Sequence, residues 1–182
     1  MNIEQIIKGC RSNNRGSQEE LYHLYKGVLF SLCLKYCRNE AEAEDNLHNA
    51  FIEIFTTIDK FKGIGSFEGW MKRITINKAI NSFKKTKQLT PIKDNFTGDT
   101  DVGEEEMNIP ADTILEFVQQ LPDQYRLIFC LYELDDYPHK EIAAMLSISE
   151  STSKSNLHRA KAILKEKITA LRNAEHTQSH GS

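Results

Sequence analysis

Apolar side chains recur at helical spacing through most of this chain, and one stretch near the middle interrupts the pattern. In residues 21–32, and again in 47–58, large apolar residues fall three or four positions apart, as on one face of an α-helix. No run alternates apolar and polar residues over a useful β-strand length. Residues 88–111 lose the periodicity and hold two prolines, two glycines and an acidic run. We therefore expect an all-α fold of two small helical domains joined by a flexible acidic linker.

This interruption separates two candidate domains. We place the first domain, the linker, the second domain and a tail at residues 1–87, 88–111, 112–172 and 173–182. Helices of the first domain should begin where a side chain can accept a hydrogen bond from the first helical turn. The expected starts are Ser17 with Glu20 three residues later, Asn39 with Glu42, and Ser66.

Charged residues are sorted along the chain, so a net charge of −3 hides strongly charged segments. Residues 40–59 hold six acids and no Lys or Arg, whereas residues 60–87 hold eight bases against one acid. Residues 89–112 hold seven acids and one lysine, and residues 150–172 hold six bases against two acids. The basic segments indicate surfaces that face a polyanion, although solvated helix faces would explain the charge alone equally well.

The second domain carries the pattern of a helix-turn-helix. A helix over residues 125–134 follows Pro122, a short helix begins after Pro138, and a turn at residues 147–149 leads to a long helix capped by Ser149. The second helix of such a unit enters the DNA major groove. At 100° per residue, its core side holds Ser153, Leu157, Ala160 and Leu164. The candidate DNA-binding residues are Ser151, Thr152, Lys154, Ser155, His158, Arg159 and Lys161. An ordinary helical hairpin with a wet basic face is the alternative.

A second basic helix is expected over residues 67–87, with a core stripe of Ile76, Ala79, Ile80 and Phe83. Amides that can read bases, lysines that can hold phosphates and aromatic rings that can stack suit single-stranded or melted nucleic acid. The candidate residues are Phe61, Phe67, Trp70, Arg73, Asn77, Lys78, Asn81, Lys84 and Lys85. A lone tryptophan is more often part of a core, so the basic charge of the segment carries this interpretation.

These segments resemble the two conserved domains of the extracytoplasmic-function (ECF) sigma factors, small specificity subunits of bacterial RNA polymerase. The first resemblance rests on residues 43–51 (AEDNLHNAF), 67–77 (FEGWMKRITIN) and the basic pair at 84–85. The second rests on residues 121–126 (LPDQYR), 140–143 (KEIA), 146–149 (LSIS), 152–155 (TSKS) and 159–160 (RA).

The resemblance implies a mechanism. The acidic helix would dock on the clamp helices of core RNA polymerase through Glu42, Asp45, His48, Asn49 and Glu53. The loop and the first basic helix would recognise and melt the minus-ten element and hold a flipped base of the non-template strand. The second domain would read the upstream element and touch the polymerase flap. The resemblance also implies an anti-sigma partner and requires no catalytic residue. The sequence has no apolar run of the roughly 18 residues that a membrane span needs, and its four cysteines have no zinc-ligand spacing. We therefore expect a cytoplasmic protein with no cofactor, metal or membrane insertion.

Five positions depart from the usual pattern of that family. His48 stands where Gln is common, Asn81 stands where Asp is usual, and Ser153 replaces a common Val on the core side of the recognition helix. Residues 135–136 are Asp-Asp instead of Glu-Gly. We expect Ser153 to loosen the packing slightly and the Asp pair to alter the turn before the helix-turn-helix.

Two other classes of function are open to the chain. A conventional transcription regulator would share the helix-turn-helix and use the first domain to sense a ligand or partner. A metal or redox enzyme would use Cys33, Cys37 and the histidines, but no further ligands stand at a recognised spacing. Buried helical cysteines explain the pair better.

Overall fold

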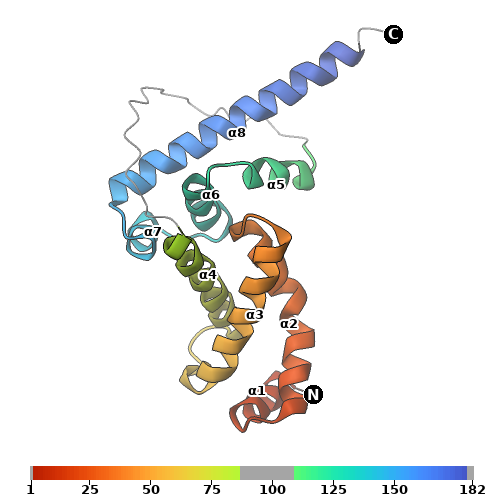
Figure 1. The fold of residues 1–182 in the computed structure, drawn as a ribbon, viewed down its shortest axis with the longest axis vertical. Coiled ribbons are helices and arrows are strands. Elements are labelled where there is room, and N and C mark those ends of the chain that lie inside the picture. The colour runs from red at the N-terminus through yellow and green to blue at the C-terminus, as the bar shows by residue number, and fades with distance from the viewer. Residues whose placement is uncertain (1, 87–108, 180–182) are drawn as a thin grey trace. The chain divides into compact units, whose positions relative to one another are not determined.

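The structure is a computed structural model that describes residues 2–86 and 109–179. Every regular element in these residues is a helix, which confirms the expected all-α class. The chain divides into two compact units, Met1–Lys87 and Gln88–Ser182 (Figure 1). Most of the predicted linker, residues 88–108, lies outside the described residues. Within the described part, no helix is long and apolar enough to cross a membrane.

Four helices build the first unit: α1 (Ile3–Arg11), α2 (Arg15–Tyr36), α3 (Glu40–Thr57) and α4 (Phe67–Thr86). A short 3-10 turn, η1 (Ile58–Lys60), follows α3. The helices α2, α3 and α4 all pack against one another, and α1 packs on α2 and η1 (Figure 1). Helix α1 has no counterpart among the expected helices.

Two of the three expected helix starts in this unit are confirmed. Asn39 Oδ1 accepts a hydrogen bond from the Glu42 backbone N–H at 2.9 Å, and Glu42 Oε2 accepts one from the Arg38 N–H at 3.1 Å. Ser66 Oγ accepts from the Gly69 N–H at 2.9 Å. Each cap satisfies a backbone donor that the first helical turn leaves without a partner.

The expected start at Ser17 is wrong, because Asn14 caps α2 instead. Asn14 Oδ1 accepts a hydrogen bond from the Ser17 N–H at 3.0 Å, so Ser17 is the third residue of the helix. Ser17 is buried, and a Cβ added to Gly9 of α1 would overlap its Oγ. The serine therefore contributes to the close contact between α1 and α2, and it does not start a helix.

The core of the first unit contains one buried amide. Around it, apolar side chains of α2, α3 and α4 are almost fully buried, among them Leu21, Leu29, Ile54, Met71, Ile76 and Ile80. Asn46 Nδ2 donates to Thr75 O at 3.1 Å and lies 3.3 Å from Cys33 Sγ, so it links α3 to both other helices. These contacts offset part of the cost of burying the amide.

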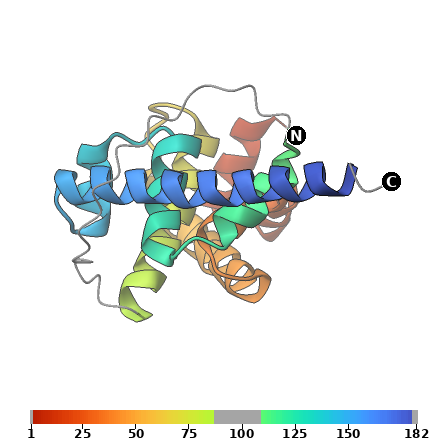
Figure 2. The ribbon, with the colours of Figure 1, turned by 90° about the horizontal axis from the view of Figure 1, so that it is seen from above.

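The second unit is built on one long helix, α8 (Glu150–Ser179), which Figure 2 shows as a continuous rod. Helix α8 continues through residues 173–179, a segment assigned above to the tail. The shorter elements α5 (Ala111–Gln119), α6 (Asp123–Phe129) and α7 (His139–Leu146) pack on it. Ser149 Oγ accepts from the Thr152 N–H at 3.0 Å, and Ser147 ends α7 in the left-handed conformation (φ 58°). The predicted helix-turn-helix and its cap are confirmed.

The segment before the helix-turn-helix differs from the expected single helix over residues 125–134. The α-helical part, α6, ends at Phe129. A π-helical turn, η2 (Cys130–Leu134), follows it directly. In the following turn Asp136 has φ 56°, and the Tyr137 N–H donates to Leu131 O at 2.9 Å. The turn therefore needs a left-handed residue, a conformation that glycine adopts easily and Asp tolerates at some cost.

Candidate protein and nucleic-acid interfaces

The acidic residues of α3 share the side of the helix that points away from the core. Four of the five predicted polymerase-binding residues are exposed, and Glu53 is partly buried. At 100° per residue, Glu42, Asp45, Asn49 and Glu53 fall within one quarter of the helix circumference, and His48 lies about 60° beyond Asp45. The structure thus brings the five together as one surface, which we call the α3 face.

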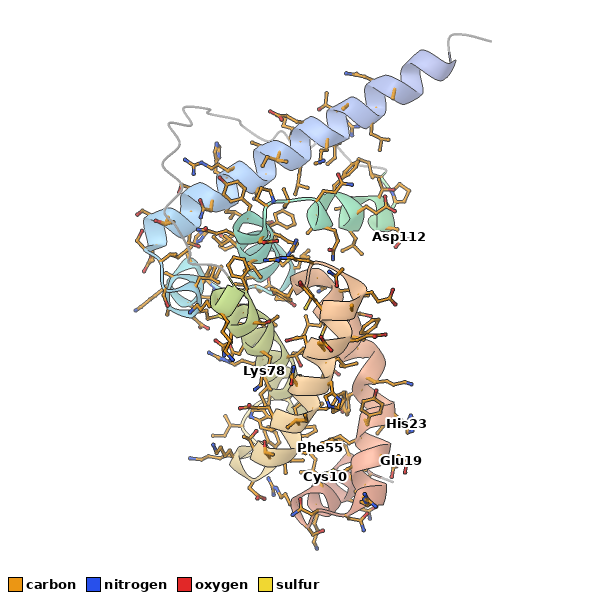
Figure 3. The ribbon with its side chains drawn as sticks, in the orientation of Figure 1. Cys10, Glu19, His23, Phe55, Lys78 and Asp112 are labelled. Atoms are coloured by element: carbon orange, nitrogen blue, oxygen red, sulfur yellow. The ribbon has the colours of Figure 1, made fainter. Side chains whose placement is uncertain are left out.

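An ion pair joins the α3 face to α4. Lys78 Nζ lies 2.7 Å from Glu53 Oε2, and both side chains are partly exposed. Lys78 is labelled in Figure 3, on α4 beside α3. Lys78 therefore lies to one side of the other predicted DNA-binding residues of α4. A partly exposed ion pair such as Lys78–Glu53 stabilises the unit by at most about 1 kcal/mol.

The remaining predicted residues of α4 form a stripe along its outer side. Trp70, Asn77, Asn81 and Lys84 follow at intervals of seven, four and three residues, which places them within about 40° of one line. Arg73 and Lys85 lie at the edges of this stripe. Asn77, Asn81, Arg73 and Lys85 are exposed, whereas Trp70 and Lys84 are partly buried. Amide, cationic and aromatic groups therefore alternate on one accessible surface, which we call the α4 stripe.

Phe67 does not belong to that accessible surface. Its side chain is only 8% exposed, and its ring stacks on Trp70 with 5.5 Å between centroids and 23° between planes. Phe61 packs against both rings at 5.1 and 5.6 Å, and Tyr25 of α2 meets Phe67 at 6.3 Å. Phe67 thus lies on the buried side of the Trp70 and Phe61 rings and packs against both. A base could reach the Trp70 and Phe61 rings, which are partly exposed, but not Phe67.

Phe61 begins the α3–α4 loop (residues 61–66), which is fastened to α1. Arg11 Nη2 donates to Phe61 O at 2.7 Å. A cavity of about 770 Å³ lies between α1 and the loop, with Lys8, Arg11 and Lys62 among its lining residues together with Glu4 and Asp59. Gly63 and Gly65 have φ of 73° and 77°, which only glycine adopts readily.

On α8 the predicted DNA-facing side chains gather as expected. Ser151, Lys154 and Ser155 are exposed, while Thr152, His158, Arg159 and Lys161 are partly exposed. The four inward positions Ser153, Leu157, Ala160 and Leu164 are buried, which confirms the predicted orientation of the helix. Lys161 Nζ pairs with Glu133 Oε1 of η2 at 2.6 Å. Lys161 therefore lies at the border of this surface.

Ser153 has a hydrogen-bond partner that the sequence did not reveal. Its Oγ is fully buried and lies 2.9 Å from His139 Nδ1 at the start of α7, while the His139 ring stacks on Tyr132 at 4.4 Å. The hydroxyl thus links the two helices of the helix-turn-helix, and this bond offsets the loss of apolar packing expected from the missing valine.

This contact predicts a dependence of stability on pH. Burial lowers the pKa of His139, the nearby Lys154 lowers it further, and Glu150 and Glu133 act in the opposite direction. The unfolded chain then binds the proton more tightly, so the contribution of His139 is present above about pH 6.5 and is lost as the pH falls below that value. Between about pH 7.5 and pH 5.5, we expect calorimetry to show a larger drop in Tm for the wild type than for His139→Gln. Equal drops would contradict this role.

Comparison with known proteins decides the family. Residues 21–88 match the family "Sigma-70 region 2", and residues 111–164 match "Sigma-70, region 4", together about two thirds of the chain. The ECF sigma factor SigW of Bacillus subtilis is 27% identical over 94% of this chain and 99% of its own. The chain belongs to the ECF sigma factors of the sigma-70 family.

Further similarities agree with this membership. The ECF sigma-E factor of Escherichia coli is 26% identical to this sigma factor and covers 93% of both chains. The sigma factor RpoE of Bartonella quintana, solved in complex with the anti-sigma factor NepR, shares the fold. Its TM-score is 0.52 at 17% identity, covering 81% of this chain and 94% of that one.

The family membership excludes one alternative. One alternative treated the first unit as a ligand-sensing domain of a conventional regulator. That alternative is wrong, because the segment matches sigma-70 region 2. Cys10, Cys33, Cys37 and Cys130 are all buried, and none of them is part of a disulfide. No three His, Cys, Asp or Glu side chains of the described residues stand close enough to hold a metal ion.

Helix α1 adds residues to this sigma factor's surface that the sequence analysis missed. Lys8 and Arg11 lie against the α3–α4 loop, although 50 residues of chain separate Arg11 from Phe61. The spacing of Ile3, Ile6, Ile7 and Cys10 could have indicated the helix itself. No local signal could have indicated its contact with the loop.

Proposed function

We propose that this ECF sigma factor binds core RNA polymerase through the α3 face and opens promoter DNA with the α4 stripe and the α3–α4 loop. The predicted DNA-binding residues of α8 read the upstream promoter element. The observation that carries this proposal is the placement of an acidic surface and an aromatic, amide-rich basic surface on adjacent helices of one unit. The first suits a basic protein partner, and the second suits a melted strand.

The chain itself needs no catalytic group in this scheme. Rings such as Trp70 and Phe61 can stack on unpaired bases, and Lys84 and Lys85 can neutralise phosphates. Binding of the open strand then favours the open state, because a ligand shifts an equilibrium by its differential affinity. The polymerase performs the chemistry of RNA synthesis in the cytoplasm. The solved relative's complex with an anti-sigma factor favours an anti-sigma protein as a further partner.

Run-off transcription tests the proposal. Core bacterial RNA polymerase is incubated with genomic fragments of the host, with and without the full chain. Discrete transcripts that require the chain are expected, and their start sites give both promoter elements. Failure to produce transcripts, together with failure to co-purify with core polymerase, would overturn the proposal.

The lysine pair at the end of α4 should govern the salt dependence of promoter binding. Replacing Lys84 and Lys85 together by alanine removes two phosphate contacts, so the slope of log affinity against log salt should become shallower by about 1.5. Filter binding of holoenzyme across a salt series measures this slope. Lys26→Ala removes an exposed lysine of α2 and should leave the slope unchanged. An unaltered slope in the double variant would show that neither lysine contacts phosphate.

A further inference from the structure

Ile64 is the most exposed large apolar side chain of the described residues, with 84% of its surface open to solvent. It stands in the α3–α4 loop between Gly63 and Gly65, both with positive φ. A Cβ built on either glycine would have no neighbour within 4 Å, so the tip of the loop stands clear of the rest of the unit. The loop therefore presents a branched apolar side chain where burial within the unit contributes nothing to stability.

The base of the same loop is held from two sides. Arg11 of α1 donates to Phe61 O at 2.7 Å. The Phe61 ring packs on Phe67 and Trp70 of α4. The loop is therefore exposed at its tip but anchored at its base. A force on Ile64 would be resisted by α1 and by α4, which both hold that base.

Basic side chains accompany this tip. Lys62 precedes the glycine turn, and Lys8 and Arg11 line the cavity beside it. Glu4 and Asp59 line the same cavity, so the bases outnumber the acids there. A phosphate backbone can therefore approach the loop from the side of α1.

From these observations we infer that Ile64 is a wedge that enters the base stack of promoter duplex at the edge of the segment captured by the α4 stripe, and that α1 braces the wedge through Arg11. The inference rests on the proposed promoter-opening function. Proteins that kink duplex DNA insert apolar side chains such as Ile, Leu and Phe between base steps and unstack them. A step unstacked by Ile64 exposes its bases to Trp70 and Phe61, whose rings pack on each other at the base of the loop.

The test compares two DNA templates. Holoenzyme made from the full chain and core polymerase is mixed with a promoter fragment found by run-off transcription, carrying a fluorescent base analogue in the minus-ten element. The second template is the same fragment with a non-complementary minus-ten segment, which needs no unstacking. Ile64→Ser should slow opening of the duplex about tenfold and change the rate on the premelted template by less than about twofold. Ile64→Leu should behave as wild type.

Arg11 is tested as a positioning residue in the same assay. Arg11→Gln should slow opening of the duplex while sparing the premelted template, and Arg11→Lys should restore part of the rate. Leu24→Ser is the matched control, because Leu24 of α2 is an exposed apolar residue (56%). It should leave both rates unchanged.

Three results would overturn the inference. They are an unchanged duplex rate for Ile64→Ser, an equal loss on both templates, and an equal slowing by Leu24→Ser. Each leaves the sigma activity of the wild-type chain standing. Absence of transcription by the wild type would instead overturn the proposed function and this inference with it.

Discussion

Replacing Trp70 by alanine is expected to reduce the rate of promoter opening by about tenfold to a hundredfold, since stacking of one base on an aromatic ring contributes about 1–3 kcal/mol. Trp70 is partly exposed on the α4 stripe and rests on the buried ring of Phe67. The expected loss is therefore in strand capture. Fluorescence of a base analogue in the minus-ten element, followed in stopped flow, measures the rate.

Two further measurements separate this effect from damage to the fold. Trp70→Phe keeps an aromatic face and should recover most of the rate. Trp70→Ala also removes the ring contacts with Phe61 and Phe67, so its melting temperature should fall by several degrees, whereas that of Trp70→Phe should stay closer to wild type. Normal opening by Trp70→Ala would show that no base stacks on this ring.

Replacing Lys154 or Arg159 by alanine should weaken use of the upstream promoter element by about 1–3 kcal/mol each, if each reads a base edge in the major groove. Lys154 is exposed and Arg159 partly exposed on α8. Besides the loss of activity, discrimination between upstream sequences should relax at one base position for each variant. Transcription from promoters in which each upstream base is replaced in turn measures both quantities.

A matched control distinguishes base reading from general attraction to DNA. Lys165 lies further along α8 and is also exposed. Lys165→Ala should lower activity uniformly across upstream sequences and leave discrimination unchanged. If Lys154→Ala and Arg159→Ala gave the same uniform pattern as Lys165→Ala, their contacts would be to phosphate alone.

The sequence predicted those parts of the fold that local physics determines. The caps at Asn39, Ser66 and Ser149 were correct because a short polar side chain before an apolar periodic run has few other roles. The start at Ser17 was wrong because Asn14 stands three residues earlier and competes for the same donors. Burial against α1, which is a tertiary contact, determines what Ser17 does.

The candidate surfaces show the same division between local and distant determinants. Helical spacing was enough to place the α8 residues on one side, because their angular positions depend only on the helix itself. It could not show that Phe67 is buried, that Ser153 meets His139, or that Lys78 pairs with Glu53. Each of those contacts joins different helices, and the packing of the unit decides it.

Because every cysteine is buried, the rate at which each one is alkylated can report how often its unit opens. Burial raises the pKa of the Cys10 and Cys33 thiols, and thiol reagents attack the thiolate form. In the folded chain, modification must therefore wait for an opening event. Cys130 belongs to the second unit and the other three cysteines to the first. Alkylation rates of the separate peptides, read by mass spectrometry, would report the opening kinetics of the two units from one native sample.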